Sequence, residues 1–162
     1  SMQAAKPKVM KWQERLYAAV VKMVRRGTRV LDIGCGSGIL AIASMLLGAT
    51  EGFGVDIDPL AVKTAVENGK MNNLTEPSLQ FVCGDLADKV TKKYDVVVAN
   101  IVADIIILFS TQVRAFMKQG AKFVASGIID SRADEVVLAL QSAGLIVKER
   151  IEENGWVCLV CE

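Results

Sequence analysis

The sequence predicts an α/β fold built on a doubly wound, mostly parallel sheet of seven strands, with an antiparallel strand from a C-terminal hairpin. Two observations predict it. Short apolar runs alternate with segments of helical periodicity, and a glycine-rich turn joins the first of these runs to the helix after it. Such alternation requires right-handed crossovers, which leave the strands parallel. We expect residues 1–162 to form one domain, with a leading basic helix over about 1–26 and a core over 28–162.

The predicted strands cover residues 29–33, 52–56, 79–83, 94–99 and 122–126, and the predicted helices cover about 9–26, 38–47, 58–71, 103–117 and 131–143, with a turn at 119–120. Asp58 followed by Pro59 is typical of a helix start. Ser131 can cap the last helix, and Gly144 can end it. Asn154-Gly155, between runs at 145–149 and 156–160, predicts a hairpin.

Composition excludes several classes of protein. Apolar residues make up 52% of the chain and mean hydropathy is +0.36, yet no apolar run approaches the roughly 20 residues that a membrane span needs. The net charge of +1 implies no general attraction to membranes or polyanions. We therefore expect no membrane association.

The four cysteines do not form a recognisable metal motif, because the chain contains no histidine and no second cysteine pair with zinc spacing. Cys158 and Cys161 lie three residues apart in a predicted strand, so they should point to opposite faces. We expect no metal. Reduced thiols and the lack of a signal peptide favour a cytoplasmic location.

The most informative segment is residues 30–38, VLDIGCGSG, between the first strand and its helix. Gly34, Gly36 and Gly38 permit a tight turn and close approach of a ligand to the backbone. Ile39 stands where the nicotinamide fingerprint GxGxxG requires its third glycine. A phosphate-binding loop gains nothing from the charge of Asp32, whereas a ligand with an ammonium group does. The alternative is a plain strand-to-helix turn.

Polar residues also follow three later strands, at the sheet edge where open parallel sheets bind ligands. Asp56 is placed to accept both hydroxyls of a ribose, and Ile57 to pack on an adenine face. Asp85 is placed near the adenine amine and Leu86 near the ring. Asn100 would face the reacting group and accept from an incoming amine. A solvated acid, a turn aspartate and a helix cap are the alternative interpretations of Asp56, Asp85 and Asn100.

An ammonium group and a nucleoside occur together in S-adenosyl-L-methionine, which is the predicted cofactor, with S-adenosyl-L-homocysteine as product. The predicted cofactor contacts are Asp32, Gly34, Cys35, Gly36, Gly38, Asp56, Ile57, Asp85, Leu86 and Asn100. Asn100 is also the predicted catalytic residue.

The strings VLDIGCGSGILAIA, GVDIDPLAV, YDVVVANIVAD, SGI at residue 126 and ENGWVCLV resemble the methyltransferases that modify ribosomal protein number eleven of the large subunit. The resemblance covers about residues 20–162. It implies a Rossmann-like class I methyltransferase sheet. It also implies methylation of lysine side chains and an N-terminal α-amine, with that ribosomal protein as partner. It assigns Gly34, Asp56 and Asn100 to the cofactor.

The chain also departs from that family. The family has a separate N-terminal recognition domain and a segment rich in glycine, histidine and threonine before the first motif, where residues 10–13 here read Met-Lys-Trp-Gln. One alternative is therefore a truncated cofactor-binding module with little activity. Another is a class I methyltransferase acting on RNA or a small molecule, which the basic N-terminal stretch supports. The run Asn100-Ile101-Val102 lacks the Pro-Pro-aromatic sequence that clamps a base amine, so nucleic acid is not the favoured partner.

Overall fold

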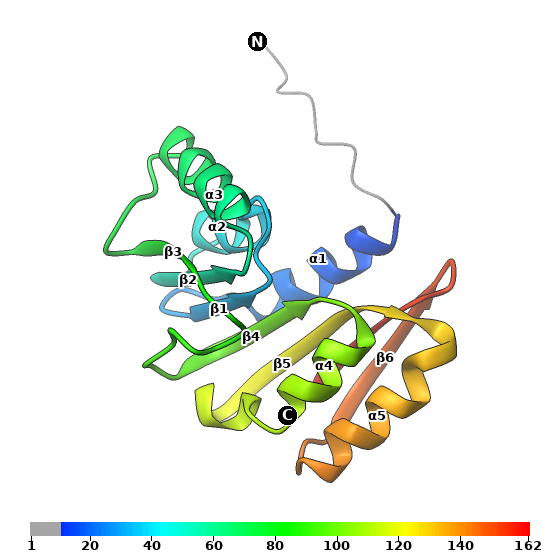
Figure 1. The fold of residues 1–162 in the computed structure, drawn as a ribbon. Helices are drawn as coiled ribbons and strands as arrows, with labels where there is room; N and C mark the ends of the chain where they lie inside the picture. Colours follow the sequence, from blue (N-terminus) through cyan, green and yellow to red (C-terminus); the bar gives the residue numbers. More distant parts are fainter. Residues whose placement is uncertain (1–10) are drawn as a thin grey trace.

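The computed structural model describes residues 11–162, and their side chains from residue 13 onward. This part of the chain forms a 7-stranded sheet in the order β3-β2-β1-β4-β5-β7-β6 (Figure 1). The strands are β1 Arg29–Ile33, β2 Glu51–Asp56, β3 Leu79–Cys83, β4 Tyr94–Asn100, β5 Met117–Ile129, β6 Val147–Glu153 and β7 Trp156–Cys161. Strands β1 to β5 are parallel, and β7 runs antiparallel to both of its neighbours. The predicted fold class is confirmed.

Helices cover both faces of the sheet (Figure 1). They are α1 Lys11–Met23, α2 Ile39–Leu46, α3 Pro59–Met71, α4 Ala103–Ser110 and α5 Ala133–Ser142. Apolar side chains of α4 and α5 are buried against one face, and those of α1, α2 and α3 against the other. The leading helix ends at residue 23 rather than 26, and its predicted start at residue 9 lies outside the described residues. Among the helices described, none has the length and apolar character that a membrane crossing requires.

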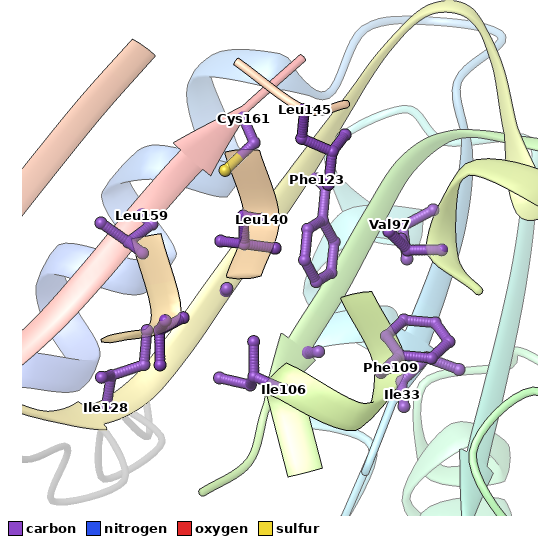
Figure 2. Close-up of a cluster of buried hydrophobic side chains, with 14 of the residues drawn as sticks. Ile33, Val97, Ile106, Phe109, Phe123, Ile128, Leu140, Leu145, Leu159 and Cys161 are labelled. Carbon is purple, nitrogen blue, oxygen red and sulfur yellow. The ribbon is translucent and has the colours of Figure 1, made fainter. Parts of the chain in front are cut away.

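The largest buried cluster lies between the sheet and the α4–α5 layer (Figure 2). Phe109 of α4 meets Phe123 of β5 edge-to-face, with ring centroids 6.0 Å apart and an interplanar angle of 67°. This pair contributes about 0.5–1.5 kcal/mol beyond the area it buries. Cys161 belongs to this cluster, whereas Cys158 belongs to the cluster under α1. The two thiols therefore lie on opposite faces of the sheet, as predicted.

The predicted helix over 103–117 is wrong in its second half. Helix α4 ends at Ser110, a 3-10 turn covers Val113–Phe116, and Met117 already belongs to β5. The hydroxyls of Ser110 and Thr111 donate to carbonyl oxygens three residues earlier, at 2.6 and 3.2 Å. Such side-chain bonds to the backbone compete with helical bonding and are typical of helix ends.

Strand β5 is longer at both ends than the predicted 122–126. The predicted turn at 119–120 is an irregularity within the strand, where Gly120 has φ 78° and pairing with β4 changes register. A second irregularity lies at Gly127, with φ 80°, where pairing with β7 shifts. Glycines in the left-handed region let extra residues bulge out without ending the ladder, so β5 continues to Ile129.

The predicted helix start at Asp58 is confirmed, because its Oδ1 accepts from the backbone amide of Leu60 at 2.9 Å. The predicted cap at Ser131 is wrong. Ser131 lies inside a 3-10 turn, and α5 begins at residue 133 with no side-chain cap. Gly144, with φ 87°, follows the end of α5 as predicted. Asn154 and Gly155 both have positive φ, which is the primed turn expected of a two-residue hairpin. Strand β6 starts two residues later than predicted, at Val147.

Candidate functional site

The site lies at the carboxyl ends of the central strands, and side-chain alternation decides what each strand presents there. In β1, Val30 is buried on the α1 face and Leu31 on the α4 face. Asp32 therefore lies on the α1 face. In β4, Val96 and Val98 are buried on that same face, so Asn100 lies there too. Since β1 and β4 are paired in parallel, Asp32 and Asn100 come to one edge.

The predicted glycine loop is a tight left-handed turn. Gly34, Gly36 and Gly38 have φ of 72°, 54° and 82°. A Cβ on Gly34 would lie 2.6 Å from the Cγ2 of Ile101, and one on Gly38 would lie 2.8 Å from the Cζ of Phe81. A Cβ on Gly36 would meet no atom of the described residues within 4 Å. Gly34 and Gly38 therefore allow close packing against Ile101 and Phe81, whereas Gly36 borders unfilled space beside the loop.

Two hollows adjoin this loop. The larger, about 430 Å³, has Asp56 and Asp85 on its wall together with the apolar Ile57, Leu86 and Ile105. Its further lining residues are Ile33, Gly34, Val55, Gly84, Asn100, Ile101 and Val102. The smaller, about 220 Å³, is lined by Gln13, Leu16, Tyr17, Asp32, Gly34, Cys35, Gly36, Ser37, Ile39, Leu40 and Asn100.

Gly34 and Asn100 line both hollows, so the two form one site with its junction at these residues. Every residue predicted for the site lines one hollow or both, with one exception. Gly38 lines neither and is instead the first residue before α2, packed against Phe81 and Ala65. Its role is to let helix and strand approach closely.

Asp32 carries the unusual electrostatics of the smaller hollow. Its side chain is 2% exposed, and its Oδ2 has no hydrogen-bond partner within the described part of the chain. The pKa of this carboxyl is raised to about 7, chiefly by burial; the backbone amide of Ala41 acts to lower it, and the charge of Asp56 adds a smaller rise. A buried carboxylate oxygen without a partner is unfavourable unless a cation or donor meets it. The hollow therefore favours a positively charged group beside Asp32.

Asp56 is held in place from two sides. Its Oδ2 accepts from the amide of Gly36 at 2.8 Å, and its Oδ1 accepts from the amide of Asp58 at 3.0 Å. These bonds tie the end of β2 to the glycine loop. A carboxylate has about four acceptor positions, so Asp56 can still accept two hydrogen bonds from a ligand in the larger hollow.

Sequence reasoning missed the contribution of α1. Leu16 and Tyr17 line the smaller hollow, although the helix is separated from the glycine loop by a whole strand. The pKa of the Tyr17 hydroxyl is raised by burial and by the charge of Asp32. Burial, followed by the charges of Asp32 and Asp56, raises the pKa of the Cys35 thiol, which therefore stays protonated. Helical spacing showed that α1 has an apolar face, but only packing shows where that face lies.

The larger hollow also has walls that were not predicted. Ile101, Val102 and Ile105 line it from the segment that joins β4 to α4. Val102 is 63% exposed and Ile105 37%, so both side chains remain available to a ligand. The run of apolar residues after Asn100 could have signalled this wall. Throughout the described residues, no group of His, Cys, Asp or Glu is arranged to hold a metal ion.

Comparison with known proteins agrees with this geometry. The family model for ribosomal protein L11 methyltransferase (PrmA) matches residues 12–162. A ribosomal protein L11 methyltransferase of Pelotomaculum thermopropionicum is 46% identical over 138 residues, which are 85% of this chain and 44% of the relative. One of Clostridium botulinum is 42% identical over 144 residues, 89% of this chain and 45% of the relative. The chain thus spans less than half the length of these two relatives.

A solved ribosomal protein L11 methylase of Lactobacillus delbrueckii subsp. bulgaricus superposes with a TM-score of 0.86 at 26% identity, covering 93% of this chain and 78% of that one. The match of the family model extends over nearly all described residues, including both hollows. On this evidence the chain belongs to the ribosomal protein L11 methyltransferase (PrmA) family.

Proposed function

We propose that this chain transfers methyl groups from S-adenosylmethionine to amine nitrogens of ribosomal protein L11, as a cytoplasmic enzyme. One observation carries the proposal: two hollows of different chemistry meet at Gly34 and Asn100, and the smaller contains Asp32, whose buried Oδ2 has no hydrogen-bond partner among the described residues. The cofactor has matching parts, a nucleoside on one side of its sulfonium and a charged amino acid on the other. Family membership supports the same activity.

The smaller hollow fits the amino-acid part of the cofactor. The ammonium group would lie against Asp32, whose Oδ2 would then gain the partner that it lacks among the described residues. Gly36 leaves open space on this side of the loop. Tyr17 and Ser37 bring hydroxyl groups to the same hollow, and hydroxyls can donate to a carboxylate.

The larger hollow fits adenosine. Asp56, already oriented by two backbone amides, would accept from both ribose hydroxyls. Ile57, Leu86 and Ile105 would contact the two faces of the adenine ring, and Asp85 would accept from its exocyclic amine. A mostly apolar wall with a few placed polar groups is the usual construction of a small-molecule site.

The cofactor supplies an electrophilic methyl group, and the chain's task is to position and desolvate the acceptor amine. A lysine has an ordinary pKa near 10.4, so its neutral form costs roughly 4–5 kcal/mol at pH 7. A nearby positive charge and loss of water reduce that cost. The carboxamide oxygen of Asn100, at the junction of the hollows, would accept an N–H of the amine and direct its lone pair. The sequence contains no histidine, and we assign the proton to solvent.

Two measurements test this function. Calorimetry should show binding of S-adenosylmethionine and S-adenosylhomocysteine and no binding of NAD. Incubation with tritiated cofactor and purified L11 should then label L11 at lysine or α-amine groups, while an RNA control stays unlabelled. Tight NAD binding, or label in RNA instead of L11, would refute the assignment. Cofactor binding without any transfer would support the alternative of a binding module.

A further inference from the structure

Basic side chains gather at the end of the sheet opposite the proposed site. Strands β1, β4 and β5 are neighbours and parallel, so their amino ends share one edge of the sheet. Neighbouring strands lie about 4.7–4.9 Å apart, which brings the residues at these ends close together. We call the following residues the basic edge: Arg25, Arg26, Arg29, Lys92, Lys93, Arg114, Lys118 and Lys122.

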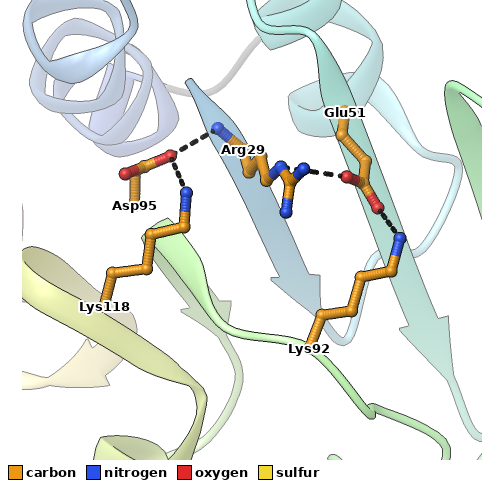
Figure 3. Close-up of polar contacts among 5 residues, drawn as sticks. All are labelled: Arg29, Glu51, Lys92, Asp95 and Lys118. Atoms are coloured by element: carbon orange, nitrogen blue, oxygen red, sulfur yellow. Dashed lines mark hydrogen bonds and ion pairs between the residues drawn. The ribbon is translucent and has the colours of Figure 1, made fainter. Parts of the chain in front are cut away.

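Two acidic residues, Glu51 and Asp95, contact basic residues of this edge (Figure 3). Glu51 pairs with both Arg29 and Lys92, at 3.2 and 2.7 Å, and is therefore shared between two cations. Asp95 pairs with Lys118 at 3.2 Å while its Oδ2 also accepts from the backbone amide of Arg29.

Glu162 is shared in the same way, because it pairs with Lys122 and with Lys148 of β6. Arg25, Arg26 and Lys93 are exposed, and no carboxylate of the described residues pairs with them. The basic edge therefore keeps an excess of positive charge that faces solvent.

The surface at this edge is also hollowed. A cavity of about 500 Å³ has Lys93, Arg114 and Lys118 on its wall, with Glu162 as its acidic member. The guanidinium of Arg114 donates to the carbonyl oxygen of Gly144, which holds that cation at the cavity. An anionic group entering the cavity would therefore meet several cations, at least one of them held by a hydrogen bond.

The net charge of the chain is only +1, so this excess must be balanced elsewhere. The proposed site holds Asp32, Asp56 and Asp85, and within the described part of the chain no lysine or arginine lines either of its hollows. Positive charge is thus concentrated at one end of the sheet and negative charge at the other. Such segregation creates a local potential that the net charge conceals.

We infer that the basic edge binds the phosphates of RNA without recognising its bases. The proposed site, at the opposite end of the sheet, remains accessible while RNA is bound. The cations extend across three neighbouring strands instead of converging on one point, which suits phosphates in series more than a single anion. Lysine and arginine contacts to phosphates supply affinity that is independent of sequence and falls with salt. This role is separate from methyl transfer: RNA is a docking partner and does not accept the methyl group.

The test is fluorescence anisotropy of a labelled single-stranded RNA titrated with the full chain at several salt concentrations. The double variant Arg26→Glu with Lys93→Glu removes two unpaired cations of the basic edge. Its matched control is Lys63→Glu with Lys89→Glu, which changes net charge equally at exposed positions outside that edge. Thermal melting and S-adenosylhomocysteine binding are measured on both variants as controls. Neither should change in the edge variant, because neither Arg26 nor Lys93 lines the proposed site.

We expect the edge variant to bind RNA at least about tenfold more weakly than the parent. The slope of log affinity against log salt should become shallower by about 1.4, since each phosphate contact on a single strand contributes about 0.7. The control should stay within about twofold of the parent. Equal weakening by both variants, or no RNA binding by the parent at low salt, would overturn the inference. So would equal competition by polyglutamate or by anionic vesicles, since either would show that the partner is not RNA.

Discussion

Affinity for the cofactor should depend on pH through Asp32. The pKa of this buried carboxyl is raised to about 7, whereas binding an ammonium group requires the ionised form. Apparent affinity then scales with the ionised fraction, which is about one half at pH 7 and about one hundredth at pH 5. We expect S-adenosylhomocysteine to bind about 50-fold more weakly at pH 5 than at pH 7.

The assay is calorimetry with S-adenosylhomocysteine at pH 5, 6 and 7, with 5′-methylthioadenosine as the matched ligand. The second compound keeps the nucleoside and lacks the amino acid, so its affinity should change little over this range. Asp32→Asn should bind S-adenosylhomocysteine weakly at every pH and lose the dependence. The reasoning about Asp32 is wrong if both ligands weaken in parallel, or if the variant keeps the slope of the parent.

The free energy of unfolding should also depend on pH through Asp32, and the direction of its pKa shift fixes the direction of that dependence. The folded-state pKa of Asp32, about 7, lies above its ordinary value of 3.8, so the folded state binds more protons between these values. Without ligand, the contribution of Asp32 to the free energy of unfolding is therefore greatest below about pH 4 and falls as pH rises toward 7, by about 4 kcal/mol. Urea unfolding at pH 8 should accordingly show Asp32→Asn to be more stable than the parent.

Further predictions concern neighbouring residues. Asp56→Asn should weaken S-adenosylhomocysteine binding by about 1.5–3 kcal/mol, whereas Asp58→Asn, which keeps a good helix cap, should bind as the parent does in the same calorimetric experiment. Gly34→Ala should lower the free energy of unfolding by about 2–4 kcal/mol in urea, because its φ is 72° and the new Cβ would lie 2.6 Å from Ile101. Asn100→Ala should lower kcat for L11 about tenfold or more and change the affinity for cofactor less, in a tritium-transfer assay. Elemental analysis of protein purified without added metal should find no stoichiometric zinc; one equivalent per chain would contradict our interpretation of the cysteines.

The candidate site was largely predictable because its signals are local. Three glycines in five residues permit a left-handed turn that other residues would adopt only with strain, and Asp32 lies just before that turn. Asp58 and Pro59 likewise define the start of α3 through their immediate neighbours. A prediction that depended on one residue alone was wrong. Ser131 can cap a helix, yet the chain forms a 3-10 turn there and α5 starts two residues later.

The sequence by itself determined the order of strands and helices, the glycine loop and the identity of the acids at the strand ends, since each depends on contacts within a few residues. The tertiary structure decided which strands became neighbours, and therefore how Asp32, Asp56 and Asn100, already predicted as contacts of one cofactor, are divided between two hollows. It also decided that α1 packs over the smaller hollow and that two bulges extend β5. These outcomes depend on packing between segments distant in the chain, where burial of apolar surface outweighs local preference.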